Sequence, residues 1–260
     1  MSTRSLLLLR AVGGVAVLAL LFALEGLIPF FPDRKARLRH VALNLAIGGI
    51  NLAAVALLLV WPIRWAAQWA QQSGFGLARW AGLSGAGAVA FGVVAFDAWM
   101  YGWHQANHRL GFLWRFHRMH HSERDMDVST AVRFHPGEIA ISSFLRAGVL
   151  VGLGMSYQML VIYELVLLPI IQLHHSNVRL PRRLDRALRA VIVSPNMHRL
   201  HHSVIRREHD GNYASIFSFW DRLLGSYRWR ADPQRLELGL KRLKDRSWLT
   251  LRGMLATPLR

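Results

Sequence analysis

Residues 97–121 read DAWMYGWHQANHRLGFLWRFHRMHH, in which an apolar segment runs directly into two histidine motifs. The first motif is HxxxH at 104–108, and the second is HxxHH at 117–121. The HxxHH spacing returns at 198–202, and a histidine pair lies at 174–175. Residues three and four positions apart share one face of a helix, so we expect each motif to direct its imidazoles into one space.

Several neutral imidazoles packed together cannot satisfy one another's hydrogen bonds, and protonated imidazoles repel one another. A bound cation resolves both problems, so the motifs predict a histidine-rich metal centre. The three motifs hold too many histidines for one tetrahedral ion, which favours two metals. Imidazole suits zinc, iron, copper and nickel alike. The candidate ligands from the motifs are His104, His108, His117, His120, His121, His198, His201 and His202.

Outward from this stretch, the sequence holds apolar segments of membrane length. Three apolar segments are each long enough to cross a bilayer as a helix. They are a segment around Ala11–Leu24, the segment Val41–Pro62 and the segment Gly82–Trp103. Ile139–Leu173 is predicted to form two helices with a break near Gly152–Ser156. We therefore expect an all-α integral membrane bundle of about three full spans plus a helical hairpin. A helical cap on the cytosolic side would hold the dimetal site.

Charge and composition narrow the class of protein further. The 260 residues carry a formal net charge of +17, are 53% hydrophobic and include no cysteine, which excludes disulfides, thiolate zinc sites and iron–sulfur clusters. The positive-inside rule places the basic loop 33–40 and the histidine motifs in the cytoplasm. The basic amphipathic segment 182–191 suggests docking on anionic lipid headgroups. No nucleic-acid recognition motif accompanies the charge, so nucleic acid is not an expected partner.

One carboxylate lies inside the third apolar segment. Asp97 precedes His104 by seven residues, so both lie on one stripe of a helix. An intramembrane carboxylate is a candidate functional residue, and the expected role of Asp97 is to accept the free N–H of a ligating imidazole. The alternative is an ion pair with Arg118 or Arg133 that serves helix packing.

Further short motifs flank the histidines. These are LWRF before the first HxxHH motif, RFHPGE at 133–138, HSN at 175–177, SP before the second HxxHH motif, NY at 212–213 and WDRLLGS at 220–226. With these flanks the sequence resembles the fatty acid hydroxylase / sterol desaturase superfamily of membrane di-iron oxygenases. The resemblance divides the chain into an N-terminal transmembrane anchor (1–95), a catalytic domain (96–230) and a basic C-terminal tail (231–260).

The resemblance implies two iron ions, O2 as co-substrate and electrons from a separate reductase, ferredoxin or cytochrome. The substrate would be a membrane lipid, such as a fatty acyl chain, sterol or isoprenoid, that is hydroxylated or desaturated. His175 would be a ninth metal ligand, and His135 would support the site. Asn177, with Asn107 and Asn196, is a candidate for positioning the substrate.

The expected location is the bacterial inner membrane, with the catalytic side cytoplasmic. Two alternatives remain open from the sequence. The first is a zinc-dependent membrane hydrolase, with zinc in place of iron. The second is a metal-binding or lipid-binding protein without redox chemistry.

Overall fold

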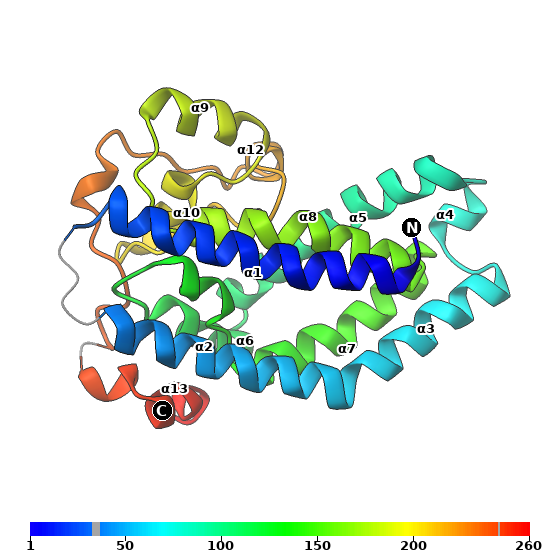
Figure 1. Cartoon of the computed structure of the whole chain (residues 1–260), viewed down its shortest axis with the longest axis horizontal. Helices are drawn as coiled ribbons and strands as arrows, with labels where there is room; N and C mark the ends of the chain where they lie inside the picture. Colours follow the sequence, from blue (N-terminus) through cyan, green and yellow to red (C-terminus); the bar gives the residue numbers. More distant parts are fainter. Residues whose placement is uncertain (33–36, 244) are drawn as a thin grey trace.

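The computed structural model describes residues 1–32, 37–243 and 245–260, which form helices joined by loops and isolated β-bridges, with no strand (Figure 1). The predicted all-α class is confirmed. The elements are α1 (Thr3–Leu27), α2 (Arg37–Ala54), η1 (Val55–Leu59), α3 (Val60–Ser73), α4 (Leu77–Trp80), α5 (Gly85–Arg109), α6 (Gly111–His121), η2 (Val128–Val132), α7 (Pro136–Leu153), α8 (Tyr157–His175), α9 (Arg182–Val191), α10 (Pro195–His201), α11 (Arg206–His209), α12 (Phe219–Leu223), η3 (Pro233–Arg235), η4 (Arg246–Leu249), α13 (Leu251–Leu255) and η5 (Thr257–Leu259).

Five helical stretches are long and apolar enough to cross a membrane, and they are Thr3–Leu27, Arg37–Trp80, Gly85–Arg109, Pro136–Leu153 and Tyr157–His175. The last two are the predicted hairpin. The break between the two helices falls where it was expected. The helix α7 ends at Leu153, and Gly154, which follows it, adopts the left-handed conformation with φ 70°.

The second stretch is longer than the predicted segment Val41–Pro62. The chain stays helical past Pro62, which lies in the first turn of α3, and α3 ends at Ser73. A proline ring clashes with the carbonyl four residues earlier, which here belongs to Leu58. The π-helical turn Val55–Leu59 lies directly before the proline and widens the helix at that point, so the chain passes the proline without ending the helix.

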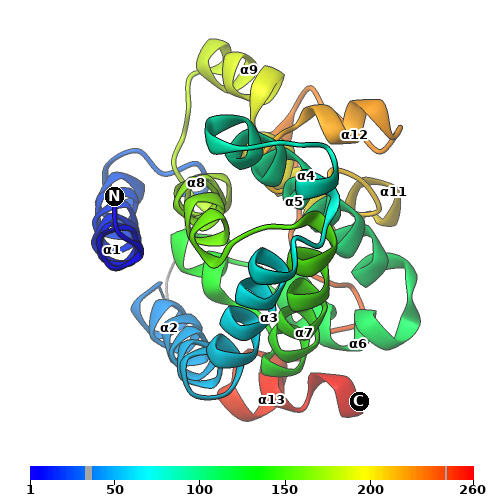
Figure 2. The same cartoon turned by 90° about the vertical axis from the view of Figure 1, so that its right-hand side faces the viewer.

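The long helices run along the long axis of the molecule (Figure 1). The N-terminus lies at one end, and α6, α10 and the C-terminal segments gather at the other. Seen end-on, α1 lies at the edge of the bundle, where it packs against α8 (Figure 2). Large apolar side chains on these helices are exposed, among them Val15, Trp61 and Trp65, as lipid contact requires. The predicted basic loop 33–40 falls partly on 33–36, outside the described residues.

A buried carboxylate fastens α1 to the end of the molecule where the histidines lie. Glu25 Oε1 accepts hydrogen bonds from the backbone N–H of Val128 and of Asn177, both at 2.7 Å. Its Oε2 lies 3.0 Å from Nη2 of Arg37 at the start of α2. One side chain thus joins α1 and α2 to the segments that follow α6 and α8.

Candidate metal centre

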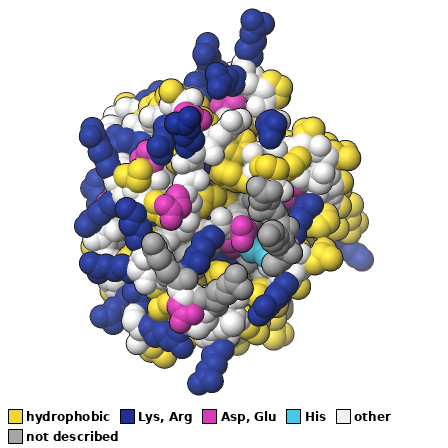
Figure 3. Space-filling view, turned by 90° about the vertical axis from the view of Figure 1, so that its left-hand side faces the viewer, with side chains coloured by type: hydrophobic (Ala, Val, Ile, Leu, Met, Phe, Trp, Pro, Cys, Tyr) yellow, Lys and Arg dark blue, Asp and Glu magenta, His cyan; other side chains and the backbone are white. Residues whose placement is uncertain are grey.

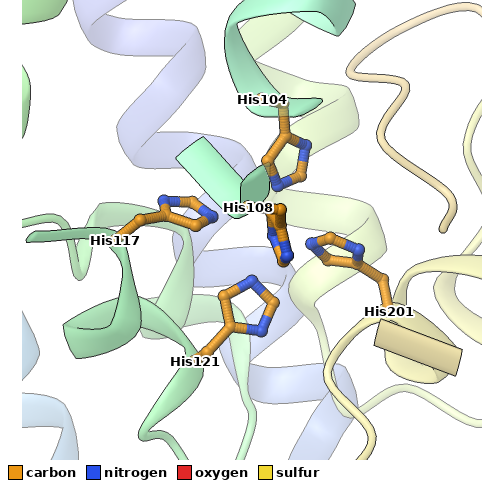
Figure 4. Close-up of side chains that lie close together, drawn as sticks. All are labelled: His104, His108, His117, His121 and His201. Atoms are coloured by element: carbon orange, nitrogen blue, oxygen red, sulfur yellow. The ribbon is translucent and has the colours of Figure 1, made fainter. Parts of the chain in front are cut away.

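Nine histidines converge at this end of the bundle in two adjacent groups. The five-histidine group is His104, His108, His117, His121 and His201 (Figure 4). The four-histidine group is His120, His175, His198 and His202. Within each group, the candidate ligand atoms all lie within 4.8 Å of one another. All nine residues proposed as ligands from the sequence and the resemblance are in these two groups.

Each HxxHH motif contributes to both groups, so the expectation that a motif fills one space is wrong. His117 and His121 of α6 point into the five-histidine group, whereas His120 points into the other. The second motif divides likewise, with His201 in the five-histidine group. Residues four apart share a helix face, but adjacent residues project about 100° apart, so the last two histidines of the motif diverge. The motif therefore bridges two neighbouring centres.

The four-histidine group has the spacing of ligands around one ion. Nε2 of His175 lies 3.2 Å from Nε2 of His120 and 2.9 Å from Nε2 of His198. Nε2 of His202 lies 3.2 Å from Nε2 of His198. Nitrogens bound at about 2.1 Å to one ion would lie roughly 3.0 to 3.4 Å from one another. The group fits a metal ion with little rearrangement.

The five-histidine group leaves its nitrogens without partners. Nε2 of His104, His117, His121 and His201 and both ring nitrogens of His108 are buried and make no hydrogen bond within the described part of the chain. Buried polar atoms are nearly always hydrogen-bonded in folded proteins. Figure 4 shows the five rings directed toward one another. A bound cation is the partner that suits five converging lone pairs.

Backbone carbonyls fix which ring nitrogen faces the centre. Nδ1 of His104 lies 2.8 Å from the carbonyl of Tyr213, and Nδ1 of His201 lies 2.7 Å from the carbonyl of Gly211. In the four-histidine group, Nδ1 of His175 lies 2.8 Å from the carbonyl of Ile171. A carbonyl only accepts, so each Nδ1 carries the proton and Nε2 is left as a free ligand atom.

A carboxylate and a backbone carbonyl orient two more rings, those of His117 and His120. Nδ1 of His117 lies 3.0 Å from Oε1 of Glu138, and Nδ1 of His120 lies 3.2 Å from the carbonyl of Arg133. Glu138 is therefore the carboxylate that receives an imidazole N–H, the role expected of Asp97. The motif RFHPGE indicated that this segment supports the site, and Glu138 is the residue through which it does so.

Asp97 holds a loop and contacts no histidine. Its Oδ1 accepts hydrogen bonds from the Tyr163 hydroxyl and the Ile216 backbone N–H, and its Oδ2 accepts from the Phe217 backbone N–H and Trp220 Nε1, all at 3.0–3.1 Å. The predicted contact with an imidazole is wrong, because the donors that reach this carboxylate come mainly from residues 216–220. The alternative ion pair is also wrong, since Arg133 lies beside Glu123.

A second buried carboxylate fastens the same loop. Asp221 accepts hydrogen bonds from the backbone N–H of Tyr213 at 2.7 Å and of Ala214 at 3.0 Å. Asn212 lies between Gly211 and Tyr213, whose carbonyls orient His201 and His104. Its φ is 57°, a conformation that asparagine tolerates better than most residues. Asp97 and Asp221 together hold the loop 211–221, whose carbonyls orient His104 and His201. The motifs NY and WDRLLGS are explained by this role.

His135 and Asn177 each make a structural hydrogen bond. Nδ1 of His135 accepts from the Gly137 backbone N–H at 3.0 Å and so caps α7. Asn177 Oδ1 accepts from the Phe31 backbone N–H at 2.9 Å, which fastens the segment after α1. Neither side chain belongs to either histidine group. Their catalytic roles stay predictions.

Three neighbours of the groups were not assigned as site residues from the sequence. The ring of His174 lies 4.0 Å from that of His198, outside both groups. His209 and Asp210 come within metal-binding distance of His108. Oδ1 of Asp210 lies 3.7 Å from Nδ1 of His108. The sequence signal for His209 and Asp210 was their position seven and eight residues after the second HxxHH motif.

A cavity of about 120 Å³ adjoins both groups. It is lined by five of the nine histidines and by apolar side chains of α5, α7 and α8, including Met100, Ile139, Leu167 and Ile171. The polar side chains of Glu138, Ser142 and Arg146 on α7 also line it. Of the asparagines considered for positioning, Asn107 lines it, and its Oδ1 is buried without a hydrogen bond among the described residues. The cavity connects the histidines to the interior of the apolar helices.

Burial keeps five histidines that lie outside the apolar helices neutral. Burial, reinforced by the neighbouring imidazoles, lowers the pKa of His120, His121, His198, His201 and His202 well below the ordinary value of 6.5. A neutral imidazole presents a lone pair to a metal without first losing a proton. At neutral pH these five residues are ready to bind a cation.

Glu138→Ala should weaken metal binding without unfolding the protein. The substitution removes the acceptor that orients His117, and loss of such a partner lowers metal affinity by about 10- to 100-fold. Ser142→Ala, one turn along α7 in the same cavity, is the matched control and should keep wild-type affinity. Competition with a graded series of chelators, followed by elemental analysis, measures both. Equal metal retention in the two variants would contradict the role of Glu138.

The metal-free protein should lose stability on acidification. Because the folded pKa of these five histidines is lowered, the unfolded chain binds more protons below about pH 6.5, and stability falls as the pH falls. Each histidine contributes about 1.4 kcal/mol per pH unit in that range. We expect the melting temperature in detergent to drop by at least about 10 °C between pH 7.5 and 5.5. An unchanged melting temperature would show that the groups are not buried and neutral.

Comparison with known proteins identifies relatives of this chain. The ornithine lipid hydroxylase OlsE of Rhizobium tropici is 30% identical over 152 residues, which are 58% of this chain and 45% of that protein. The alkylglycerol monooxygenases of Homo sapiens and Danio rerio are 27% and 30% identical over 55% and 52% of this chain. The matches cover 31% and 29% of those two proteins, so the chain spans less than half the length of these relatives. No solved structure matches the chain significantly.

A family model described as fatty acid hydroxylase matches residues 89–226. This stretch is more than half of the chain and holds all nine histidines of the two groups. Together with the five long apolar helices, the match identifies a multi-pass membrane protein. The chain belongs to the fatty acid hydroxylase family.

Proposed function

We propose that this protein is a membrane-bound di-iron oxygenase that hydroxylates or desaturates a lipid with O2 and electrons supplied from outside. The observation that carries the proposal is the cavity that touches both histidine groups and the apolar side chains of α5, α7 and α8. Its position lets an alkyl chain reach the histidines from within the apolar helices. The nine histidines are the proposed ligands, with one metal ion in each group.

The lining of the cavity favours an extended apolar substrate. Leu167 and Ile171 of α8 and Ile139 of α7 offer methyl and methylene surface, which suits an acyl chain, a sterol or an isoprenoid. The relatives' names refer to an ornithine lipid and an alkylglycerol, and both kinds of molecule carry a long alkyl chain on a polar head. We infer a substrate of this amphiphilic kind, with its chain in the cavity.

Iron held in the two groups would supply the activation of O2. In a hydroxylation, one oxygen atom enters a C–H bond and the other leaves as water, which consumes two electrons and two protons. The chain itself orients the imidazoles through the carbonyls of Gly211 and Tyr213, and the apolar wall excludes water from the reacting bond. Neither group includes a carboxylate, so a hydrolytic dizinc centre is less well supported.

The proposal keeps the three predicted regions of the chain. Residues 1–95 would be the membrane anchor, 96–230 the catalytic domain and 231–260 a basic tail. The family model begins at residue 89 and ends at residue 226, close to the two proposed boundaries. The proposed location is the bacterial inner membrane, with the histidine groups on the cytoplasmic side, as the basic loops favour.

Lipid profiling under ¹⁸O2 tests the activity. Cells that express the protein should accumulate a lipid heavier by one ¹⁸O atom, or lighter by two hydrogens if the product is desaturated. His120→Ala and His201→Ala each remove one proposed ligand, one from each group, and should reduce the product at least about 100-fold. An unchanged lipid profile in cells that contain iron-loaded protein would refute the proposed function.

Filling the cavity should separate substrate binding from metal binding. Ile171→Trp places a larger side chain in the cavity, so we expect product formation to fall at least about tenfold while metal content stays at the wild-type level. Val166→Trp makes the same change on an exposed position of α8 and should leave the activity unchanged. Equal activity of the two variants would place the substrate elsewhere.

A further inference from the structure

A second cavity reaches the histidine groups from a different direction. It has a volume of about 510 Å³, and His108 of the five-histidine group forms part of its wall. The rest of its wall comes from the end of α5, from α6 and from residues 204–210 and 240–243. Apart from the end of α5, these segments lie outside the five apolar helices, so this cavity faces the aqueous side of the molecule.

The second cavity is strongly basic. Among the described residues, five cations line it against one carboxylate, and the cations are Arg109, Arg118, Arg206, Lys241 and Arg242. The carboxylate, Asp210, already lies 3.1 Å from Nε of Arg206, so it cannot neutralise the others. Figure 3 shows Lys and Arg side chains around the end of the molecule where residues 240–243 lie. A partner that enters this cavity must be acidic.

Aromatic rings join the second cavity to the metal centre. Trp114 lines the cavity, and its ring lies 5.2 Å from that of His108 and 5.5 Å from that of His121. The His209 ring, also in the wall, is stacked on Trp114 at 5.8 Å with an interplanar angle of 3°. A group bound in the cavity is therefore one aromatic ring away from two proposed ligands of the five-histidine group.

We propose that this basic cavity is the docking site of an acidic electron-donor protein, which delivers electrons through Trp114 to the five-histidine group. The inference rests on the proposed function, which needs two electrons for each O2. The sequence contains no cysteine, so it offers no thiolates to hold an iron–sulfur cluster. Two one-electron donors, each oxidised in turn, supply the two electrons. Lipid enters the apolar cavity and the donor docks at the basic one, so neither blocks the other.

Electrostatic docking predicts a particular energetic signature. Attraction between a basic cavity and an acidic protein raises the association rate and weakens as salt is added. Weak redox encounters bury little surface, so a few charges supply much of the affinity. Replacement of two cations of this cavity by carboxylates should therefore weaken binding of the acidic protein about tenfold or more at low salt.

Binding can be measured without any metal. The full chain is placed in nanodiscs of phosphatidylcholine, and a plant-type ferredoxin, a small acidic [2Fe–2S] protein, serves as the probe in biolayer interferometry. Lys241→Glu with Arg242→Glu changes two exposed residues of the cavity. Arg182→Glu with Arg183→Glu makes the same charge change on exposed positions of α9, outside the cavity.

The cavity variant should bind the ferredoxin at least about tenfold more weakly, and the α9 variant within about twofold of the wild type. Equal weakening in both would show that net charge alone attracts the probe, and no weakening in either would place docking elsewhere. If the cavity variant instead loses only binding of phosphatidylglycerol vesicles, the cavity holds a lipid headgroup and the proposal is wrong. An iron-free, inactive protein would refute the proposed function while these binding results remain readable.

Discussion

The convergence of nine imidazoles on two points is the constraint on which the rest of the structure depends. In the five-histidine group, six buried ring nitrogens have no hydrogen bond within the described residues. Each costs about 1–3 kcal/mol, so together they approach the whole stability of a typical domain, about 5–15 kcal/mol. A bound cation turns this cost into a gain, because free lone pairs are what a metal requires. The fold therefore stores its metal affinity in ring nitrogens that have no hydrogen bond among the described residues.

Much of the remaining structure holds these rings in place. The loop 211–221 supplies the carbonyls for His104 and His201, and two buried carboxylates, Asp97 and Asp221, hold that loop by its backbone N–H groups. Glu25 joins α1 and α2 to the ends of the segments that carry the histidines. The two carboxylates Glu25 and Asp97, which lie inside the apolar helices, are thus explained by support of the metal centre.

The sequence predicted which histidines gather at the site better than it predicted their arrangement. Spacing and resemblance identified all nine histidines, and apolar runs located the long helices and the break before α8. Spacing defines which residues share a helix face, but not where the neighbouring helices lie, so the division of each HxxHH motif between two groups could not be foreseen. Asp97 was misjudged for the same reason, because its partners in residues 216–220 are more than a hundred positions away. The helical path from α2 past Pro62 depends on the π-helical turn Val55–Leu59, which no residue's helix propensity predicts.

The central claim is that the two histidine groups each hold one iron ion. The most direct measurement is elemental analysis, combined with Mössbauer spectroscopy, on protein grown with ⁵⁷Fe and purified without oxygen. The account predicts two irons per chain with nitrogen-rich coordination, and a reduction to one or none when a ligand is removed from either group. Two zinc ions per chain in the active protein, or a single iron shared by all nine histidines, would contradict it.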